Sequence, residues 1–281
     1  MTSEPNQKIT LLGVFAHPHD FTHAAGTCAH HVKRGDRVAI VILTDGSTMH
    51  NERLYDERRK PPAQQDPKII SQSQEHYAAQ KARELRQVCE LFGVTDVRIL
   101  PNPDTFIRRS DEMIHQLVDW ICDLRPDILI TQRPQHESRH RIREPDDHFI
   151  CARIVHEALA VAAQAAPGRD RAPHEVAQVY YIGVGSGWEQ IDLFVDITDQ
   201  YEKRIEAERM FGTQNLAPSK ANRKIEIGAG FYGWHTRVPY AEPFIRANSE
   251  LSRYLTLTEE SRSQARESHV QREKRIARTG R

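Results

Sequence analysis

The sequence predicts an α/β protein, a Rossmann-like three-layer α/β/α sandwich built around a mostly parallel sheet. Two apolar runs, Ile9–Ala16 and Arg37–Leu43, are nearly unbroken, which is typical of strands buried on both faces. The segment between them has a helical pattern that starts near Thr22 and stops at Gly35, a residue that commonly ends helices. Together they form a βαβ unit, and such units imply parallel strands joined by right-handed crossovers.

The same alternation continues along the chain, so the sheet is expected to grow by further pairs of strands and helices. We expect helices over Tyr77–Phe92, Ser110–Leu124 and Asp147–Ala163. We expect strands over Asp96–Leu100, Asp127–Thr131, Ala177–Ile182 and Leu193–Ile197.

A single domain over residues 1–257 accounts for this pattern, and two segments depart from it. Residues 47–76 are polar, contain prolines and are too long for a simple connection, so they form either a lid beside the active site or a surface insertion. Residues 258–281 are mostly charged and polar. We expect this tail to be a solvated helix or disordered, and a contact in a homo-oligomer is a third alternative.

The charge balance excludes several classes of protein. Lys and Arg together number 39, as do Asp and Glu, so the formal net charge is zero. The chain has no overall electrostatic reason to bind nucleic acid or an anionic membrane, and it shows no signal peptide or membrane span. Its four cysteines lie far apart in apolar helical patterns, which favours buried free thiols. We therefore expect a cytoplasmic protein with a small-molecule substrate.

Polar side chains follow the first strand directly, at the edge where open α/β sheets bind ligands. His17, His19, Asp20 and His23 crowd into this one short segment. Imidazole and carboxylate groups together suit zinc or a similar divalent ion. A phosphate site is a poor alternative, because no glycine fingerprint follows the strand.

A second polar cluster follows the Asp127–Thr131 strand. It runs over residues 131–136 and 143–148 and ends at His148, near the start of a helix. Neither cluster is specific alone, but two clusters at neighbouring strand ends make a strong case for a metal centre.

The order of the motifs also resembles that of a known family, the LmbE-like zinc deacetylases. This is the family of N-acetylglucosaminyl-phosphatidylinositol de-N-acetylase and the mycothiol-pathway deacetylase. The resemblance runs from residue 9 to about residue 246 and rests on Ala16–Phe21 (for A-H-P-D-D-E), Val38–Gly46, Arg125–Leu129, Asp147-His148 and Ala241–Phe244.

The resemblance implies a metal-dependent hydrolase that removes an acyl group, most naturally N-acetyl, from a small polar or sugar-like amide. It places the ligands of one divalent ion, expected to be Zn²⁺, on His17, Asp20 and His148. Three protein ligands and an open position fit a catalytic zinc site, where the ion polarises the amide carbonyl and activates water. The positions that match other motifs of the family imply catalytic roles for His19 and Asp147 and substrate-binding roles for Lys81 and Asp104, and His136 on a loop is expected to contact substrate as well.

Three positions depart from the family pattern. His19 stands where the family has an aspartate that acts as general base, and it is open whether His19 is the base, a structural residue or a fourth ligand. Pro145 stands where the family has a histidine; Glu144 takes that place only if one residue is inserted, and otherwise His136 or His140 is expected to serve instead. Lys81 replaces an arginine and loses its bidentate fork.

These departures keep a second hypothesis open, a divergent member that retains the metal pocket but is not a deacetylase. A nucleotide-dependent α/β enzyme is the weakest of the three alternatives, because a glycine-rich phosphate loop is missing. His50 is expected to be exposed to solvent, and Glu242 is expected to organise the C-terminal wall through hydrogen bonds.

Overall fold

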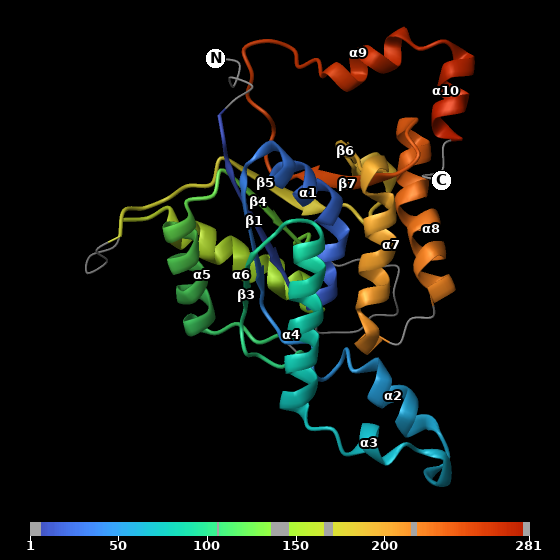
Figure 1. Ribbon diagram of the computed structural model, residues 1–281. Coiled ribbons are helices and arrows are strands. Elements are labelled where there is room, and N and C mark those ends of the chain that lie inside the picture. Colours follow the sequence, from blue (N-terminus) through green and yellow to red (C-terminus); the bar gives the residue numbers. More distant parts are fainter. Residues whose placement is uncertain (1–6, 106, 136–145, 166–170, 215–217, 278–281) are drawn as a thin grey trace.

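A seven-stranded sheet in the order β3-β2-β1-β4-β5-β7-β6 forms the centre of the protein (Figure 1). The computed structural model describes residues 7–105, 107–135, 146–165, 171–214 and 218–277. The strands are β1 (Thr10–Phe15), β2 (Arg37–Ile42), β3 (Asp96–Ile99), β4 (Ile128–Thr131), β5 (Gln178–Ile182), β6 (Leu193–Asp196) and β7 (Ala241–Arg246). The pairs from β3 across to β5 are parallel, while β7 runs antiparallel to both of its neighbours. The expected mostly parallel α/β fold is confirmed.

Helices cover both faces of this sheet (Figure 1). The α-helices are α1 (Ala25–Arg34), α2 (Glu52–Arg59), α3 (Pro67–Ile70), α4 (Gln74–Leu91), α5 (Asp111–Leu124), α6 (Asp147–Ala162), α7 (Tyr201–Met210), α8 (Pro218–Thr236), α9 (Glu259–Arg266) and α10 (His269–Ile276). Short 3₁₀ helices are η1 (Pro18–Ala24), η2 (Pro62–Gln64), η3 (Trp188–Gln190), η4 (Thr198–Gln200) and η5 (Gly212–Gln214).

The central strand β1 shows why its sequence is an unbroken apolar run. Side chains alternate between the faces of a strand, and Leu11 and Phe15 pack into the core beneath α1 and α4. Leu12 and Val14 pack into the opposite core, beneath α5 and α6. Because both faces of β1 are buried from Leu11 to Phe15, a charged side chain would be costly anywhere in this stretch.

The expected elements agree with the structure to within a few residues, and the segment after β1 differs most. The helix expected to start near Thr22 begins as the 3₁₀ helix η1 at Pro18 and becomes α-helical only at Ala25. Proline suits this start, since its fixed backbone angle fits a first helical turn and its missing N–H is not needed there.

The C-terminal helices α7 and α8 and the strand β7 were not expected from the sequence. Helix α7 buries the charged side chains of Arg204 and Glu208, positions that a hydrophobic pattern assigns to the surface. Helix α8 contains Gly228, Gly230 and Gly233, which weaken its helical pattern. Their placement depends on tertiary contacts, in which α8 packs against both α7 and β7.

Residues 47–76 and the C-terminal tail both contain helices. Within residues 47–76, Glu57 of α2 accepts a hydrogen bond from the backbone N–H of Asp66, just before α3. The pair projects from one end of the sheet (Figure 1). The tail forms α9 and α10, and Gln264 of α9 donates a hydrogen bond to the Thr236 carbonyl at the end of α8. None of the helices in the described part of the chain has the length and apolar character that a bilayer crossing requires.

Gly93, which follows α4, provides a test of this framework. Its φ is +80°, and a Cβ at this position would lie 2.8 Å from Cγ1 of Val32 on α1. We predict that Gly93→Ala lowers the free energy of unfolding by about 1–2 kcal/mol, through left-handed strain and this clash. Gly228→Ala, at a helical position with nothing within 4 Å of the added Cβ, is the control and is expected to change stability by less than about 1 kcal/mol, in the stabilising direction. Urea denaturation measures both, and equal effects would contradict the assignment.

Candidate metal centre and active site

The loop after β1 folds His17 and Asp20 against each other. The backbone N–H of His17 donates to Oδ2 of Asp20 at 2.9 Å, and the N–H of Asp20 donates to the carbonyl of His17 at 3.1 Å. These reciprocal bonds close the first turn of η1. Both side chains are buried, so this short motif points two potential ligands inward at the end of β1.

The third predicted ligand, His148, reaches the same place from α6. Its Nε2 lies 3.4 Å from Oδ2 of Asp20, and Nδ1 of His17 lies 3.4 Å from the same oxygen. The three side chains offer ligand atoms that all lie within 4.8 Å of one another. His148 is the exposed member of the three, so the cluster is accessible from the side of α6.

The donor set fits a divalent cation. Two imidazoles and one carboxylate are the ligands of many catalytic zinc sites. Nδ1 of His17 is buried and has no hydrogen-bond partner among the described residues, as expected of an atom reserved for a ligand.

The electrostatics of the cluster point the same way. Burial lowers the pKa of His17, but the nearby carboxylates of Asp147 and Asp20 outweigh it and raise that pKa to about 9. Burial raises the pKa of Asp20, but His148 and His17 hold it well below its usual range. Burial also lowers the pKa of His148, and Asp20 reverses this effect and raises it. The carboxylate thus favours positive charge on both rings, and a bound cation would replace their protons.

Two further residues hold the ligands in place. Gln132, at the end of β4, donates from Nε2 to Oδ2 of Asp20 at 2.9 Å, and its Oε1 accepts from Sγ of Cys151 at 3.1 Å. Oδ2 of Asp147 lies 3.2 Å from Nε2 of His17. Sequence analysis placed Gln132 in the second polar cluster without a role, and its contact with Asp20 joins the two clusters.

Nε2 of His19 contacts the C-terminal helices. Its Nε2 lies 2.8 Å from Oε2 of Glu208, a fully buried residue of α7, and 3.1 Å from Nζ of Lys224 on α8. Lys224 also donates to Oε2 of Glu208 at 2.9 Å. Burial lowers the pKa of His19, although Glu208 opposes the shift, so the ring is neutral at neutral pH. Sequence analysis missed Glu208 and Lys224, because it did not predict the helices that carry them.

His50, expected to be exposed to solvent, is half-buried and lies beside the cluster. Its ring lies 4.1 Å from that of His17, centroid to centroid, and its Nδ1 lies 2.7 Å from Oδ2 of Asp104. Asp104 is completely buried and also accepts hydrogen bonds from the backbone N–H groups of Thr48 and His50. His17, His50 and Asp104 form a second group with metal-ligand spacing. Asp104, a predicted substrate-binding residue, thus holds residues 48–50 against the site.

Of the other two predicted substrate-binding residues, the structure describes one. Lys81 is buried, with Nζ 3.9 Å from Oε2 of Glu52 and 5.5 Å from the centre of the Tyr77 ring. Burial lowers the pKa of Lys81. His136, together with His140 and the other members of residues 136–145, lies outside the described residues.

The expectation for Glu242 is confirmed. Its carboxylate accepts hydrogen bonds from the backbone N–H groups of Gly26 and Thr27 and from the hydroxyl of Thr27. These bonds fix β7 to the start of α1.

The family model described as GlcNAc-PI de-N-acetylase, PIG-L, matches residues 12–159, the part that contains all three clustered side chains. The chain belongs to the PIG-L family. It is 30% identical over 190 residues to a 1D-myo-inositol 2-acetamido-2-deoxy-alpha-D-glucopyranoside deacetylase of Streptomyces griseus, a match that covers 61% of this chain and 54% of that protein. The chain therefore spans about half the length of this relative. The protein with the same description from Corynebacterium glutamicum is 22% identical over 230 residues, covering 73% of this chain and 74% of that protein.

Solved structures of the same fold include proteins of more than one activity. N,N'-diacetylchitobiose deacetylase from Pyrococcus horikoshii has a TM-score of 0.67 and 23% identity, over 84% of this chain and 83% of that chain. The 4-carboxy-2-hydroxymuconate hydratase GalB from Pseudomonas putida has a TM-score of 0.71 and 19% identity, over 89% of this chain and 100% of that chain. At these identities the likeness establishes the fold of this PIG-L family member.

The clustered side chains predict how the protein binds metal. We expect purified protein to carry close to one equivalent of a divalent ion by plasma mass spectrometry, and His17→Ala and His148→Ala each to lose it, because either change leaves two ligands. His30→Ala is the matched control, since His30 lies on α1 and pairs with Asp199. Wild-type protein that stays metal-free after reconstitution with zinc, iron or manganese would contradict the site.

The hydrogen bond from Gln132 to Asp20 predicts a weaker effect of a neighbouring change. Gln132→Leu removes the donor that orients the ligand oxygen and is expected to lower metal affinity by roughly 10–100-fold. Competition with a chromophoric chelator measures this, and unchanged affinity would show that Asp20 needs no support from β4.

Proposed function

We propose that this protein is a metal-dependent hydrolase that removes an acyl group, most naturally N-acetyl, from a small polar or sugar-like amide. The observation that carries the proposal is the convergence of His17, Asp20 and His148, with His148 on the open side. Membership of the PIG-L family and the deacetylases named among the relatives support the same reaction and substrate class.

We propose zinc as the metal, because two histidines and one carboxylate match its usual catalytic ligands. An ion bound there would polarise the amide carbonyl and activate water at neutral pH. Asp147, through its contact with His17, would hold the ring in its ligating orientation.

His19 is proposed as the general base, with Glu208 as its positioning residue. We propose the tautomer in which Nε2–H donates to Glu208, with Lys224 donating to the same carboxylate, so that Nδ1 is the nitrogen left to accept a proton. This arrangement would replace the aspartate that resembling proteins carry at this position. A purely structural role is the alternative, because the same contact also ties η1 to α7.

We propose that the predicted substrate-binding residues contact the substrate beside His17. Asp104 orients His50 through Nδ1, so Nε2 of His50 is available to a substrate beside His17. Lys81 lies between Glu52 and Tyr77 in the same wall, and we propose that it contacts substrate with His136.

A homo-oligomer remains part of the proposal. Helix α8 exposes Ile227, Phe231 and Trp234, which recur at helical spacing on one side. An apolar stripe of this kind supports a contact between copies of the chain.

The second candidate is a family member that keeps the metal pocket but is not a deacetylase. The observation that favours it is His19, which stands in place of the expected aspartate and is bound to Glu208. The hydratase of the same fold shows that this architecture also supports water addition. Loss of ultraviolet absorbance from an α,β-unsaturated carboxylate, with no amine release from amides, would favour this candidate.

Amine release from a panel of N-acetylated amino sugars, measured with fluorescamine, tests the proposed reaction. We expect turnover in the zinc-loaded wild type and its loss in His17→Ala. Glu208→Gln is expected to lower kcat by roughly 10²–10⁴-fold with little change in KM, the usual range for general acid–base catalysis. An unchanged kcat in Glu208→Gln, or equal or higher activity in His19→Asp, would overturn the role of His19 as base while leaving the hydrolase intact.

A further inference from the structure

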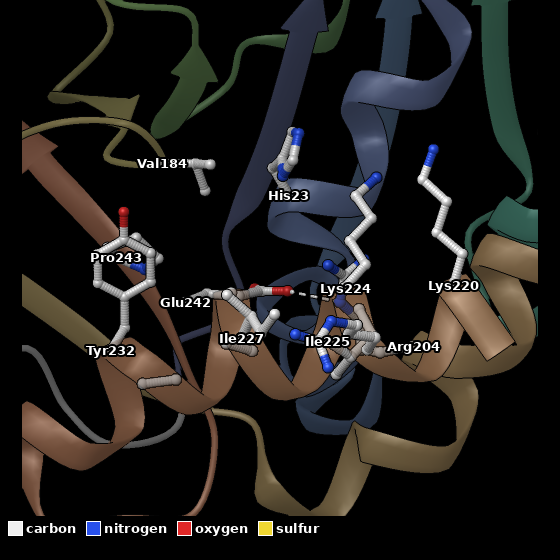
Figure 2. Close-up of a pocket in the computed structure, with 14 residues that line it drawn as sticks. His23, Val184, Arg204, Lys220, Lys224, Ile225, Ile227, Tyr232, Glu242 and Pro243 are labelled. Carbon is white, nitrogen blue, oxygen red and sulfur yellow. Dashed lines mark ion pairs between the residues drawn. The ribbon is translucent and has the colours of Figure 1, made fainter. Parts of the chain in front are cut away.

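A pocket of about 420 Å³ lies between α8, β7 and the segment that carries His23 (Figure 2). None of the three predicted metal ligands lines it. It adjoins the active site through Lys224, which lines the pocket and lies 3.1 Å from Nε2 of His19. The pocket is therefore a separate compartment beside the metal centre.

The two sides of this pocket differ in character. Figure 2 shows Lys220, Lys224 and Arg204 on one side, and Val184 and Tyr232 on the other. Arg223 also lines it, which makes four cationic side chains. A pocket with a basic side and an apolar side fits a ligand that has an anionic group on an apolar body.

Arg204 carries the strongest indication of a ligand. The side chain is only 5% exposed, yet Nε and Nη1 of its guanidinium have no hydrogen-bond partner among the described residues. Its ion-pair partner, Oε1 of Glu242, lies 3.6 Å from Nε, beyond hydrogen-bond distance. A buried guanidinium with unused donors is costly unless another acceptor satisfies it.

The acidic groups nearby are already engaged. Glu242 accepts three hydrogen bonds from Gly26 and Thr27, and Glu208 binds Lys224 and His19. Burial lowers the pKa of His23 to about 3, so this ring adds no positive charge at neutral pH. Positive charge therefore remains in excess around Arg204.

We propose that this pocket binds a small organic carboxylate, with the carboxylate at Arg204 and the apolar body against Val184 and Tyr232. The planar guanidinium fork matches a carboxylate and can donate two parallel hydrogen bonds to it. The proposal concerns binding alone, so it holds whichever reaction the metal centre performs.

Isothermal titration calorimetry of the full chain with benzoate tests the proposal, and benzamide is the neutral probe of the same shape. We expect benzoate to bind more tightly than benzamide by roughly tenfold or more, the effect of one charge-assisted hydrogen bond. Arg204→Met should remove this preference. The exposed double variant Lys220→Ala/Arg223→Ala should weaken benzoate binding by roughly two- to fivefold, as surface charges do. Arg209→Gln, on the same helix as Arg204 but outside the pocket, should leave it unchanged.

The outcomes separate this pocket from the proposed hydrolase. Benzoate binding that persists after chelation supports the pocket, whereas binding lost with the metal would place the carboxylate on the ion and overturn the inference. Equal binding of the two probes, or binding of neither, would also overturn it. If Arg204→Met does not fold, the double variant decides. A failed amine-release assay leaves all these results unchanged.

Discussion

The carboxylate of Asp20 is the point on which the candidate active site depends. One oxygen accepts hydrogen bonds from the backbone of His17 and from Gln132 and lies 3.4 Å from ring nitrogens of both His17 and His148. It thereby joins the loop after β1, the end of β4 and the start of α6. A buried carboxylate is stable only when such partners compensate for lost hydration, so the three elements must meet for Asp20 to stay ionised.

A second polar network connects the centre of the sheet to its C-terminal layer. Glu208 is fully buried, and burial alone would raise its pKa, but His19 and Lys224 hold that pKa well below its usual range. The network fixes η1 to α7 and α8. Because Lys224 also lines the pocket beside Arg204, a ligand in that pocket would sense the same charges that orient His19.

The two networks lie on different sides of the candidate site and contribute different kinds of side chain. The side of Asp20 and Gln132 contains the predicted ligands, whereas the side of α8 contributes cations and apolar side chains to the pocket. His50 belongs to neither network: it reaches the cluster from residues 47–76 and is held there by Asp104. The segment that has no counterpart in the regular βαβ pattern thus contributes a side chain to the centre.

The sequence by itself determined the parallel core and the three clustered residues. Both follow from local rules: buried strands read as apolar runs, and ligands in an open α/β sheet gather at the carboxyl ends of the strands. The polar segments after the first and fourth strands indicated a metal site, and the resemblance to the deacetylase family assigned its ligands to His17, Asp20 and His148. Only the tertiary structure decided which polar residues from distant segments are buried together. Glu208 and Arg204 look like surface charges in the sequence, and only the packing of α7 buries them. His50 looked exposed because its partners, Asp104 and His17, lie far from it in the chain, and a hydrophobic pattern records no polar contact between distant segments.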